Sequence, residues 1–193
     1  MKTLRHFALS IATLAALTAC ASTPNASASA WPATKAGEVT PRPANMPDVL
    51  ARNLATFDDL DFRVYTQQDW KDLHMSHATN IVVHYPDGHT TTGLPDHVKE
   101  LDFMWTFAPD NRITLHPIRF GTTDGEWTAV AGFIEGTFTK PMVLADGTTL
   151  QPTGKAYKLP MATLGHWNKD GQMSEEFLYW DNAALMKQIG VGN

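Results

Sequence analysis

The spacing of apolar residues in this chain changes period once, and this change limits the folds that the chain can adopt. Before residue 111 the apolar residues recur at helical spacing in three segments, 46–60, 66–78 and 93–110, with a short strand at 81–85. After residue 111 they alternate, as in strands that bury one face. Helices followed by a run of strands indicate an α+β fold, because a parallel α/β sheet requires the two kinds of element to alternate along the chain.

Four strands are expected in the second half, within 112–125, 126–139, 155–168 and 171–180. Asp-Gly pairs at 124–125 and 170–171 mark tight turns between consecutive strands, so these strands are expected to pair in antiparallel fashion. A long excursion, 140–154, interrupts them. The expected product is a strongly curved antiparallel sheet wrapped around the N-terminal helices.

The first residues form a separate segment. Two basic residues precede an apolar run, 7–17, which is too short to span a bilayer as a finished helix. The run ends in Leu-Thr-Ala-Cys, which resembles the lipobox of bacterial lipoproteins, where the chain is cut before a cysteine that is then acylated. Cys20 is the one cysteine of the chain, so a disulfide within the domain is impossible. The alternative is an ordinary secretory signal that is cut near Ala21.

The chain is therefore expected to comprise a lipoprotein signal peptide at 1–19, an acylated Cys20 with a flexible tether at 20–45, and a folded domain at 46–193. The tether consists mainly of small and polar residues and is rich in proline, so it buries too little apolar surface to fold. We expect a lipid-anchored protein of the bacterial cell envelope that faces the periplasm. The residue after the cysteine is Ala21 and not an aspartate. By resemblance to the sorting rule of enteric bacteria, this favours the outer membrane.

Charge and motifs exclude several classes of function. The formal net charge is -5 and the basic residues do not cluster, so a nucleic-acid partner is not expected. A glycine-rich phosphate loop, a nucleophile elbow and a dinucleotide fingerprint are all absent from the sequence. These absences leave binding or catalysis that uses ordinary side chains.

No metal or organic cofactor is expected. His74 and His77 are three residues apart, as paired metal ligands on a helix can be. The sequence places no third ligand beside them, and it has neither a His-Glu-x-x-His motif nor a cysteine cluster. His89, His97 and His116 belong to no motif and are expected on the surface.

Two short motifs carry a family resemblance. The first is His-Tyr-Pro-Asp-Gly at 84–88 with Gly93 after it, and the second is Tyr-Trp-Asp at 179–181 followed by Gln-Ile-Gly at 188–190. Their order and spacing, over about 46–190, resemble the SnoaL-like polyketide-cyclase branch of the nuclear transport factor 2-like superfamily. The resemblance implies a cone: a strongly bent sheet, with helices on its concave side, around an apolar pocket.

The resemblance also implies a set of partners and a site. The expected ligand is a small apolar or aromatic molecule, and a homodimer is expected. In the polyketide cyclases an aspartate at the end of the last strand acts as general acid and base, and Asp181 stands at the matching position. The excursion at 140–154 is expected to cover or reshape the mouth of the pocket.

The hairpin turn at Asp170-Gly171 predicts which residues accompany Asp181. Counting outward from the turn pairs His166 with Glu175 and places Phe177 and Tyr179 on the same face. If that face is concave, a buried carboxyl there can exchange protons with a substrate, while His166 or Tyr179 hydrogen-bonds the enolate oxygen. Glu175 and Phe177 are then expected to contact the ligand. A shift of one residue would move the whole set to the other face.

Each candidate has a structural alternative. Asp181 precedes the helical run 183–189, and aspartate is a favoured N-cap, so it is expected either to cap that helix alone or also to face the pocket. His84 ends the first strand and is either hydrogen-bonded in the turn or a donor in the pocket wall. Trp105 and Phe107 end the helix that borders the cavity and are expected either in the core or against the ligand.

Two functions follow from these observations. The first is an envelope-anchored domain that binds a small apolar or aromatic molecule and catalyses cofactor-free acid/base chemistry of the isomerase, cyclase or hydratase type. The second is a non-catalytic ligand-binding or assembly module that uses the exposed face of its sheet. An enclosed cavity that contains Asp181 and His166 would separate the first from the second.

Overall fold

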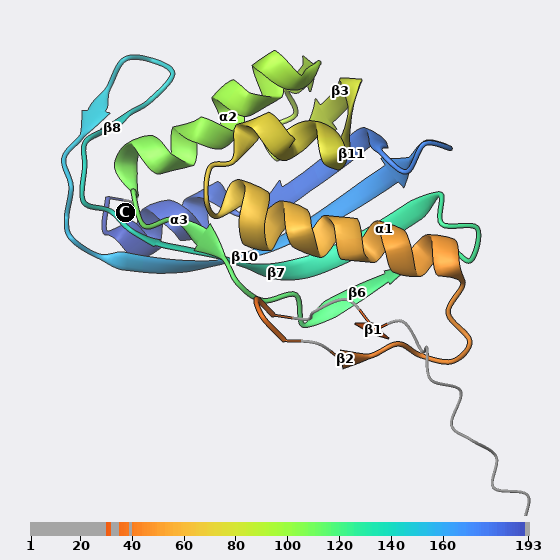
Figure 1. The fold of residues 1–193 in the computed structure, drawn as a ribbon. Helices are drawn as coiled ribbons and strands as arrows, with labels where there is room; N and C mark the ends of the chain where they lie inside the picture. Colours follow the sequence, from red (N-terminus) through yellow and green to blue (C-terminus); the bar gives the residue numbers. More distant parts are fainter. Residues whose placement is uncertain (1–29, 32–34, 39, 192–193) are drawn as a thin grey trace, which may run out of the picture.

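A seven-stranded curved sheet with helices on one of its faces forms the body of the protein (Figure 1). The computed structural model describes residues 30–31, 35–38 and 40–191. The strand order is β4-β3-β11-β10-β7-β5, and β6 also pairs with β7. The strands are β3 (His77–His84), β4 (Thr90–Thr92), β5 (Arg112–Ile113), β6 (Ile118–Gly121), β7 (Trp127–Thr137), β10 (Ala156–Trp167) and β11 (Met173–Trp180). The α+β fold class is confirmed.

The sheet is mixed, which corrects the expectation of a wholly antiparallel one. β3 pairs with β11 in parallel, with Glu176 opposite Val83 and Phe177 opposite His84. The strands joined by short turns, β6 with β7 and β10 with β11, are antiparallel, as expected, because a short turn reverses the chain. β3 and β11 lie almost a hundred residues apart in the sequence, so no hairpin fixes their relative direction.

The predicted register of the last hairpin is confirmed from His166 outward. His166 lies opposite Glu175, Leu164 opposite Phe177 and Ala162 opposite Tyr179. A bulge follows between His166 and Trp167, next to the turn. Trp167 pairs with Met173, so the turn spans 168–172 and is longer than the two-residue turn expected at Asp170-Gly171. The bulge offsets this difference, and the predicted pairs are found from His166 outward.

The helices are α1 (Asp48–Asp59), a π-helical segment η1 (Leu60–Tyr65), a short 3-10 helix η2 (Trp70–Met75), α2 (Leu94–Phe107) and α3 (Asn182–Ile189). α1 runs directly into η1, because Val64 and Tyr65 continue the apolar stripe that the sequence predicts only to residue 60. The second predicted helix, 66–78, is shorter than expected, because β3 begins at His77 and not at Ile81.

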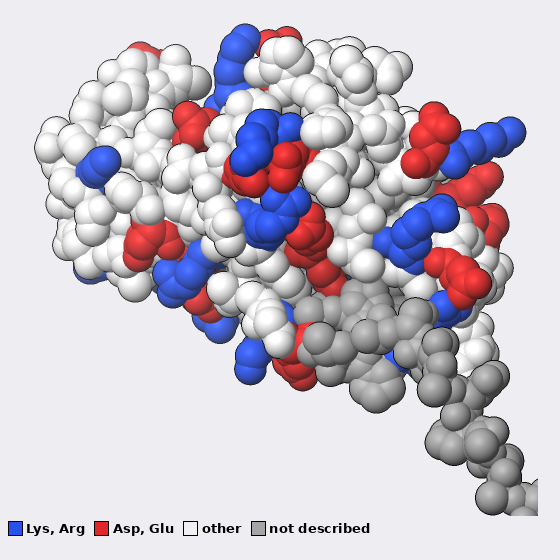
Figure 2. All heavy atoms as spheres, viewed as in Figure 1, with Lys and Arg blue, Asp and Glu red and all other residues white. Residues whose placement is uncertain are grey.

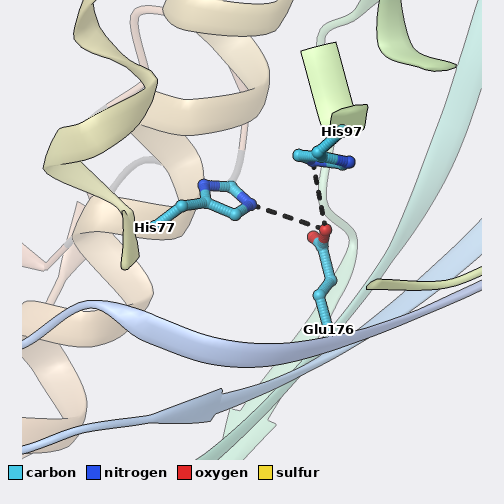
Figure 3. A group of neighbouring side chains, drawn as sticks. All are labelled: His77, His97 and Glu176. Atoms are coloured by element: carbon cyan, nitrogen blue, oxygen red, sulfur yellow. Dashed lines mark hydrogen bonds and ion pairs between the residues drawn. The ribbon is translucent and has the colours of Figure 1, made fainter. Parts of the chain in front are cut away.

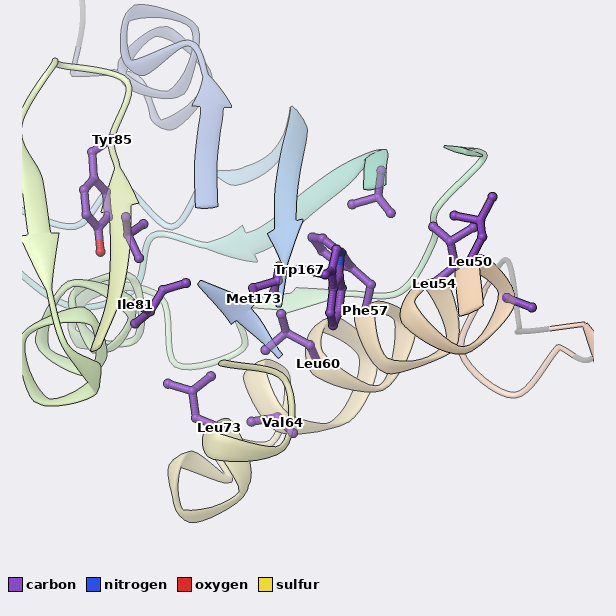
Figure 4. Packing of buried hydrophobic residues seen from close by; sticks show 13 residues of the cluster. Leu50, Leu54, Phe57, Leu60, Val64, Leu73, Ile81, Tyr85, Trp167 and Met173 are labelled. Carbon is purple, nitrogen blue, oxygen red and sulfur yellow. The ribbon is translucent and has the colours of Figure 1, made fainter. Parts of the chain in front are cut away.

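The core lies between the helices and the sheet in two clusters. In the first, Leu54 and Phe57 of α1 pack against Trp167 and Met173 from the ends of the last hairpin (Figure 4). Trp167 also donates its indole N–H to Thr128 Oγ1 at 2.8 Å, so the one polar atom of this side chain is satisfied. The second cluster surrounds Phe107 at the other end of the sheet. A cavity borders this second cluster.

The two-stranded pair β8 (Met142–Val143) and β9 (Thr149–Leu150) forms the tip of the excursion at 140–154. In Figure 1 this hairpin extends past the end of the sheet toward α2. Its base is fixed there, because the amides of Thr139 and Lys140 both donate to the carbonyl of Phe107 at 3.1 Å. The excursion is thus held against the helix layer.

The predicted signal peptide and Cys20 lie outside the described residues. Within the segment predicted as a tether, β1 (Ala30–Trp31) pairs with β2 (Thr40–Pro41), and Lys35 forms a bridge with Leu115. Parts of this segment are therefore attached to the domain, ahead of the start expected at Met46. Within the described part of the chain, no helix combines the length and the apolar character that crossing a bilayer requires.

Candidate functional site

A cavity of about 640 Å³ lies between the helix layer and the sheet. Most of its wall is apolar, with Leu101 and Met104 from α2 facing Ile134 of β7 and Met161 of β10. The β8–β9 hairpin adds residues 142–145 to the wall, as expected for the excursion. Sites for small molecules commonly have volumes of about 300–1,000 Å³ and mainly apolar walls.

A polar cluster of three side chains interrupts this apolar wall (Figure 3). His77 comes from the start of β3, His97 from the first turns of α2 and Glu176 from β11; their exposed fractions are 0%, 1% and 3%. The Nε2 atoms of both histidines lie 3.5 Å from Oε2 of Glu176. Burial, together with the neighbouring His77, lowers the pKa of His97 well below its ordinary value. His97 is therefore neutral at pH 7.

Hydrogen bonds fix the direction of both imidazole rings. Nδ1 of His77 lies 2.8 Å from Ser76 Oγ, and Nδ1 of His97 lies 2.8 Å from the hydroxyl of Tyr85. In both rings the Nδ1 side is thus occupied, and the Nε2 side points at Glu176, as the dashed lines in Figure 3 show.

A second buried network reaches the cavity through Asp61. Nδ1 of His116 bonds Asp58 and Nε2 bonds Asp61, both at 2.8 Å, and Arg119 bonds the other oxygen of Asp58. Burial alone would lower the pKa of His116, but the hydrogen bonds and charges of the two carboxylates outweigh it and raise the pKa to about 9. His116 is therefore an imidazolium at pH 7 and donates to both acids.

Asp61 is the member of this network that lines the cavity. Burial raises its pKa above the ordinary value, and the hydrogen bond from His116 opposes part of that increase. The charges of Asp61 and Glu176 also interact, so the two acids belong to the same polar part of the cavity. Tyr65, four residues after Asp61 on η1, lines the cavity as well, and its hydroxyl accepts a hydrogen bond from Asn111.

The residues predicted to line the pocket lie on the opposite face of the sheet. Glu176, Leu178 and Trp180 face the cavity, so their neighbours Glu175, Phe177 and Tyr179 face outward. The hairpin register is right, but the choice of face is wrong. Paired with Glu175, His166 lies on that outer face too.

The outward residues form contacts of their own. His84 bonds Glu175 through Nε2 at 2.8 Å and stacks on Phe177 with ring centroids 4.2 Å apart. His166 stacks on Trp127 at 4.5 Å. Tyr179 is 51% exposed. None of the five predicted residues on this face reaches the cavity, so His84 is not a donor in its wall.

Asp181 caps α3. Its carboxylate accepts hydrogen bonds from the amides of Ala183 at 2.8 Å and Ala184 at 3.1 Å, which the first turn of a helix leaves unpaired. The side chain is exposed, while Trp180 and Asn182 on either side line the cavity. The expectation that Asp181 faces the pocket is therefore corrected in favour of the capping alternative.

Trp105 and Phe107 belong to the core. Phe107 is fully buried and packs edge-on against Phe138, with ring centroids 6.0 Å apart. The ring centroids of Trp105 and Tyr65 lie 6.0 Å apart. Neither side chain lines the cavity, which Phe103 and Met104 of the same helix do. The core alternative is the one that the structure supports for both.

Comparison with known proteins decides the family. A model of the SnoaL-like polyketide cyclase family matches residues 61–189, a range that includes the cavity acids and both cavity histidines. The chain belongs to this family. Among curated proteins, none matches the sequence significantly.

Solved structures with this SnoaL-like fold come from several bacteria. A protein assigned to the SnoaL-like polyketide cyclases, from Jannaschia sp. CCS1, superposes with a TM-score of 0.66 at 18% identity, over 78% of this chain and all of the other. IdmH from Streptomyces antibioticus, assigned as a polyketide cyclase, gives 0.60 at 22% identity over 72% and 99%. AclR from Streptomyces galilaeus, assigned as a hydroxylase, gives 0.60 at 16% identity over 73% and 82%. At these identities the likeness shows the fold alone.

The SnoaL-like domain thus holds functional candidates that sequence reasoning missed. His97 and His116 were expected on the surface and are both buried. A signal for His97 exists: it shares a helical stripe with Leu94, Val98 and Leu101. No comparable signal marks His116, because its two acid partners lie more than fifty residues away in the sequence.

Proposed function

We propose that this SnoaL-like domain binds a small, largely apolar molecule with a carbonyl group and catalyses proton transfer on it, as an isomerase, cyclase or hydratase. The observation that carries the proposal is the cavity, which combines a mostly apolar wall with a buried carboxylate, Asp61. An apolar ligand gains about 25 cal/mol for each Å² of apolar surface removed from water, which suits the wall formed by α2, β7 and β10.

Asp61 is the proposed general base. A base works best when its pKa lies near the pH at which it operates, and burial moves the pKa of Asp61 upward in that direction. Asp61 takes a proton from the carbon next to the carbonyl and returns it to another carbon of the same molecule. His116 holds the carboxylate in place from behind through its 2.8 Å hydrogen bond.

Tyr65 is the proposed donor to the oxygen that becomes negative. Its hydroxyl accepts from Asn111, which leaves its own proton to be donated into the cavity. Burial raises the pKa of Tyr65, so the phenol stays protonated and able to donate. Donors placed before the reaction stabilise an oxyanion more effectively than water does.

The test measures exchange of carbon-bound hydrogen for deuterium, by NMR, over a panel of cyclic and polyaromatic ketones. Wild-type protein is expected to accelerate exchange for part of the panel, and Asp61→Asn to lower the rate by about 10²–10⁴-fold. The matched control is Asp181→Asn, which alters an exposed acid outside the cavity and is expected to leave the rate unchanged. Equal loss in both variants, or no loss in Asp61→Asn, would refute the role of Asp61.

A second candidate function is a non-catalytic binding or assembly module that docks through the outer face of the sheet. Apolar side chains lie exposed there: Ile118, Phe120, Trp127 and Tyr179. Ile118 and Tyr179 stand in one row across four strands, through Ala131 and Ala162. We propose a second copy of this chain as the partner on this face, because exposed apolar patches favour association. Phe120→Arg is expected to yield monomers in sedimentation velocity, and the control Met75→Arg to leave the oligomer unchanged.

Anchoring in the bacterial cell envelope, facing the periplasm, completes the proposal. It rests on the lipobox-like sequence before Cys20 and the apolar run at 7–17. Metabolic labelling with an alkyne fatty acid is expected to mark the wild-type protein and not Cys20→Ala, and membrane fractionation to place it in the outer membrane. Labelling of both proteins would remove this part of the proposal without affecting the cavity.

A further inference from the structure

We propose that His77, His97 and Glu176 bind one divalent transition-metal ion, zinc or iron(II), in the polar part of the cavity. The three side chains come from β3, α2 and β11, so the fold brings them together from distant parts of the sequence. The sequence shows no third ligand near His74 and His77, which argues against a metal. The structure places two further ligands, His97 and Glu176, beside His77. This inference concerns the same cavity but does not depend on proton transfer by Asp61.

The distances of both histidines from the carboxylate fit one ion. One nitrogen from each histidine and one carboxylate oxygen all lie within 4.8 Å of one another, and each histidine Nε2 is 3.5 Å from Glu176 Oε2. Zinc binds histidine nitrogen and carboxylate oxygen at about 2.0–2.2 Å, which places two ligands of one ion about 3.0–3.6 Å apart. As a hydrogen bond the contact between His77 and Glu176 is long at 3.5 Å, since such bonds are ordinarily about 2.7–3.2 Å.

The hydrogen bonds of Ser76 give a second, independent reason. Its hydroxyl donates to the carbonyl of Leu73 at 3.1 Å, so its oxygen accepts from Nδ1–H of His77 at 2.8 Å. This contact orients the ring of His77 so that Nε2 faces the carboxylate of Glu176 (Figure 3). Ser76 thus holds one ring nitrogen and leaves the other toward the place where the ion would lie.

The surroundings match those of known types of metal site. A ligating histidine usually has its other ring nitrogen hydrogen-bonded, which fixes the ring, and Ser76 and Tyr85 do this for His77 and His97. Two histidines and one carboxylate are the ligand set of several zinc hydrolases and of non-haem iron(II) enzymes. Because the cluster lines the cavity, the remaining coordination positions face the space that a ligand would enter. The ion would there bind and polarise an oxygen atom of that ligand.

The experiment measures zinc in the full-length chain, 1–193, purified without a histidine tag and with Cys20→Ser, since a free thiol also binds zinc. After equilibration with zinc chloride and removal of the excess, elemental mass spectrometry is expected to find about one zinc per chain. Glu176→Gln and His97→Gln are expected to lose the ion. Tyr85→Phe, which removes the support of His97, is expected to lower the affinity by about 10–100-fold.

The matched controls are Glu175→Gln and His84→Gln. They alter a histidine–glutamate pair from the same two strands that lies on the outer face at 2.8 Å, and they are expected to keep the full zinc content. If the cavity variants fail to fold, X-ray absorption on the zinc-loaded wild type decides, with two imidazoles and one carboxylate expected. Wild-type protein without zinc, or loss of zinc in the outer-face variants alone, would overturn the proposal. Deuterium exchange that persists in zinc-free protein would still support the role of Asp61.

Discussion

The buried imidazolium of His116 predicts a fall in stability as the pH rises from 6.5 to 9. A histidine whose pKa is raised in the folded state stabilises the protein fully below its unfolded pKa, about 6.5, and loses that contribution as the pH passes its folded pKa, about 9. Each tenfold change in proton affinity corresponds to about 1.4 kcal/mol, so the change in pKa corresponds to about 3 kcal/mol. Asp58 and Asp61 supply this stabilisation through their two hydrogen bonds.

The assay is urea unfolding followed by tryptophan fluorescence at several pH values from 6 to 9.5. In the wild type the free energy of unfolding is expected to decrease over this range, by up to about 3 kcal/mol from this group. His116→Gln is expected to be less stable at pH 6 and to lose most of the slope, so that the two curves converge near pH 9.5. His84→Gln, a half-exposed histidine on the outer face, is the control and should keep the wild-type slope. Parallel curves for the wild type and His116→Gln would refute the reasoning.

Three further predictions concern the cap, the core and the cavity. In urea unfolding, Asp181→Ala is expected to lower the free energy of unfolding by about 1 kcal/mol. Asp181→Asn is expected to lower it by much less, because asparagine also caps helices. Equal losses in the two variants would contradict the capping role. Phe57→Ala, in the middle of the first cluster, is expected to cost about 3–5 kcal/mol in the same assay, and a cost below 1 kcal/mol would contradict the packing described. In Met161→Trp the larger side chain extends into the cavity. Mass spectrometry of the purified protein is therefore expected to find less co-purifying small molecule. The melting temperature is expected to stay close to that of the wild type, because the added volume fills space in the cavity.

Most of the fold could be predicted from the sequence, because its signals are local. The Asp-Gly pair at 170–171 locates the last turn and predicts the pairs of the last hairpin from His166 outward. The change from helical to alternating spacing marks the boundary between the two halves. The direction of β3 beside β11 could not be predicted, because no short connection joins these strands. Parallel pairing between distant segments depends on how the whole chain packs.

The candidate site was harder to predict, because periodicity gives relative orientation and not the face that the helices cover. β11 carries apolar residues on both faces, with Phe177 and Tyr179 on one and Leu178 and Trp180 on the other. Two consecutive glutamates offer an acid to either face. The position of the helix layer decides which of the two faces is buried. The sequence of β11 alone does not indicate on which side that layer lies.

The two neighbouring glutamates of β11 make the protein unequally tolerant of insertions and deletions. Glu176 faces the cavity and Glu175 faces outward, so one residue gained or lost in the turn at 168–172 would exchange them and move the acid out of the interior. The excursion at 140–154 lacks this restriction, because its tip pairs only with itself. Related chains are therefore expected to differ in length at the excursion and to keep the length of the turn unchanged.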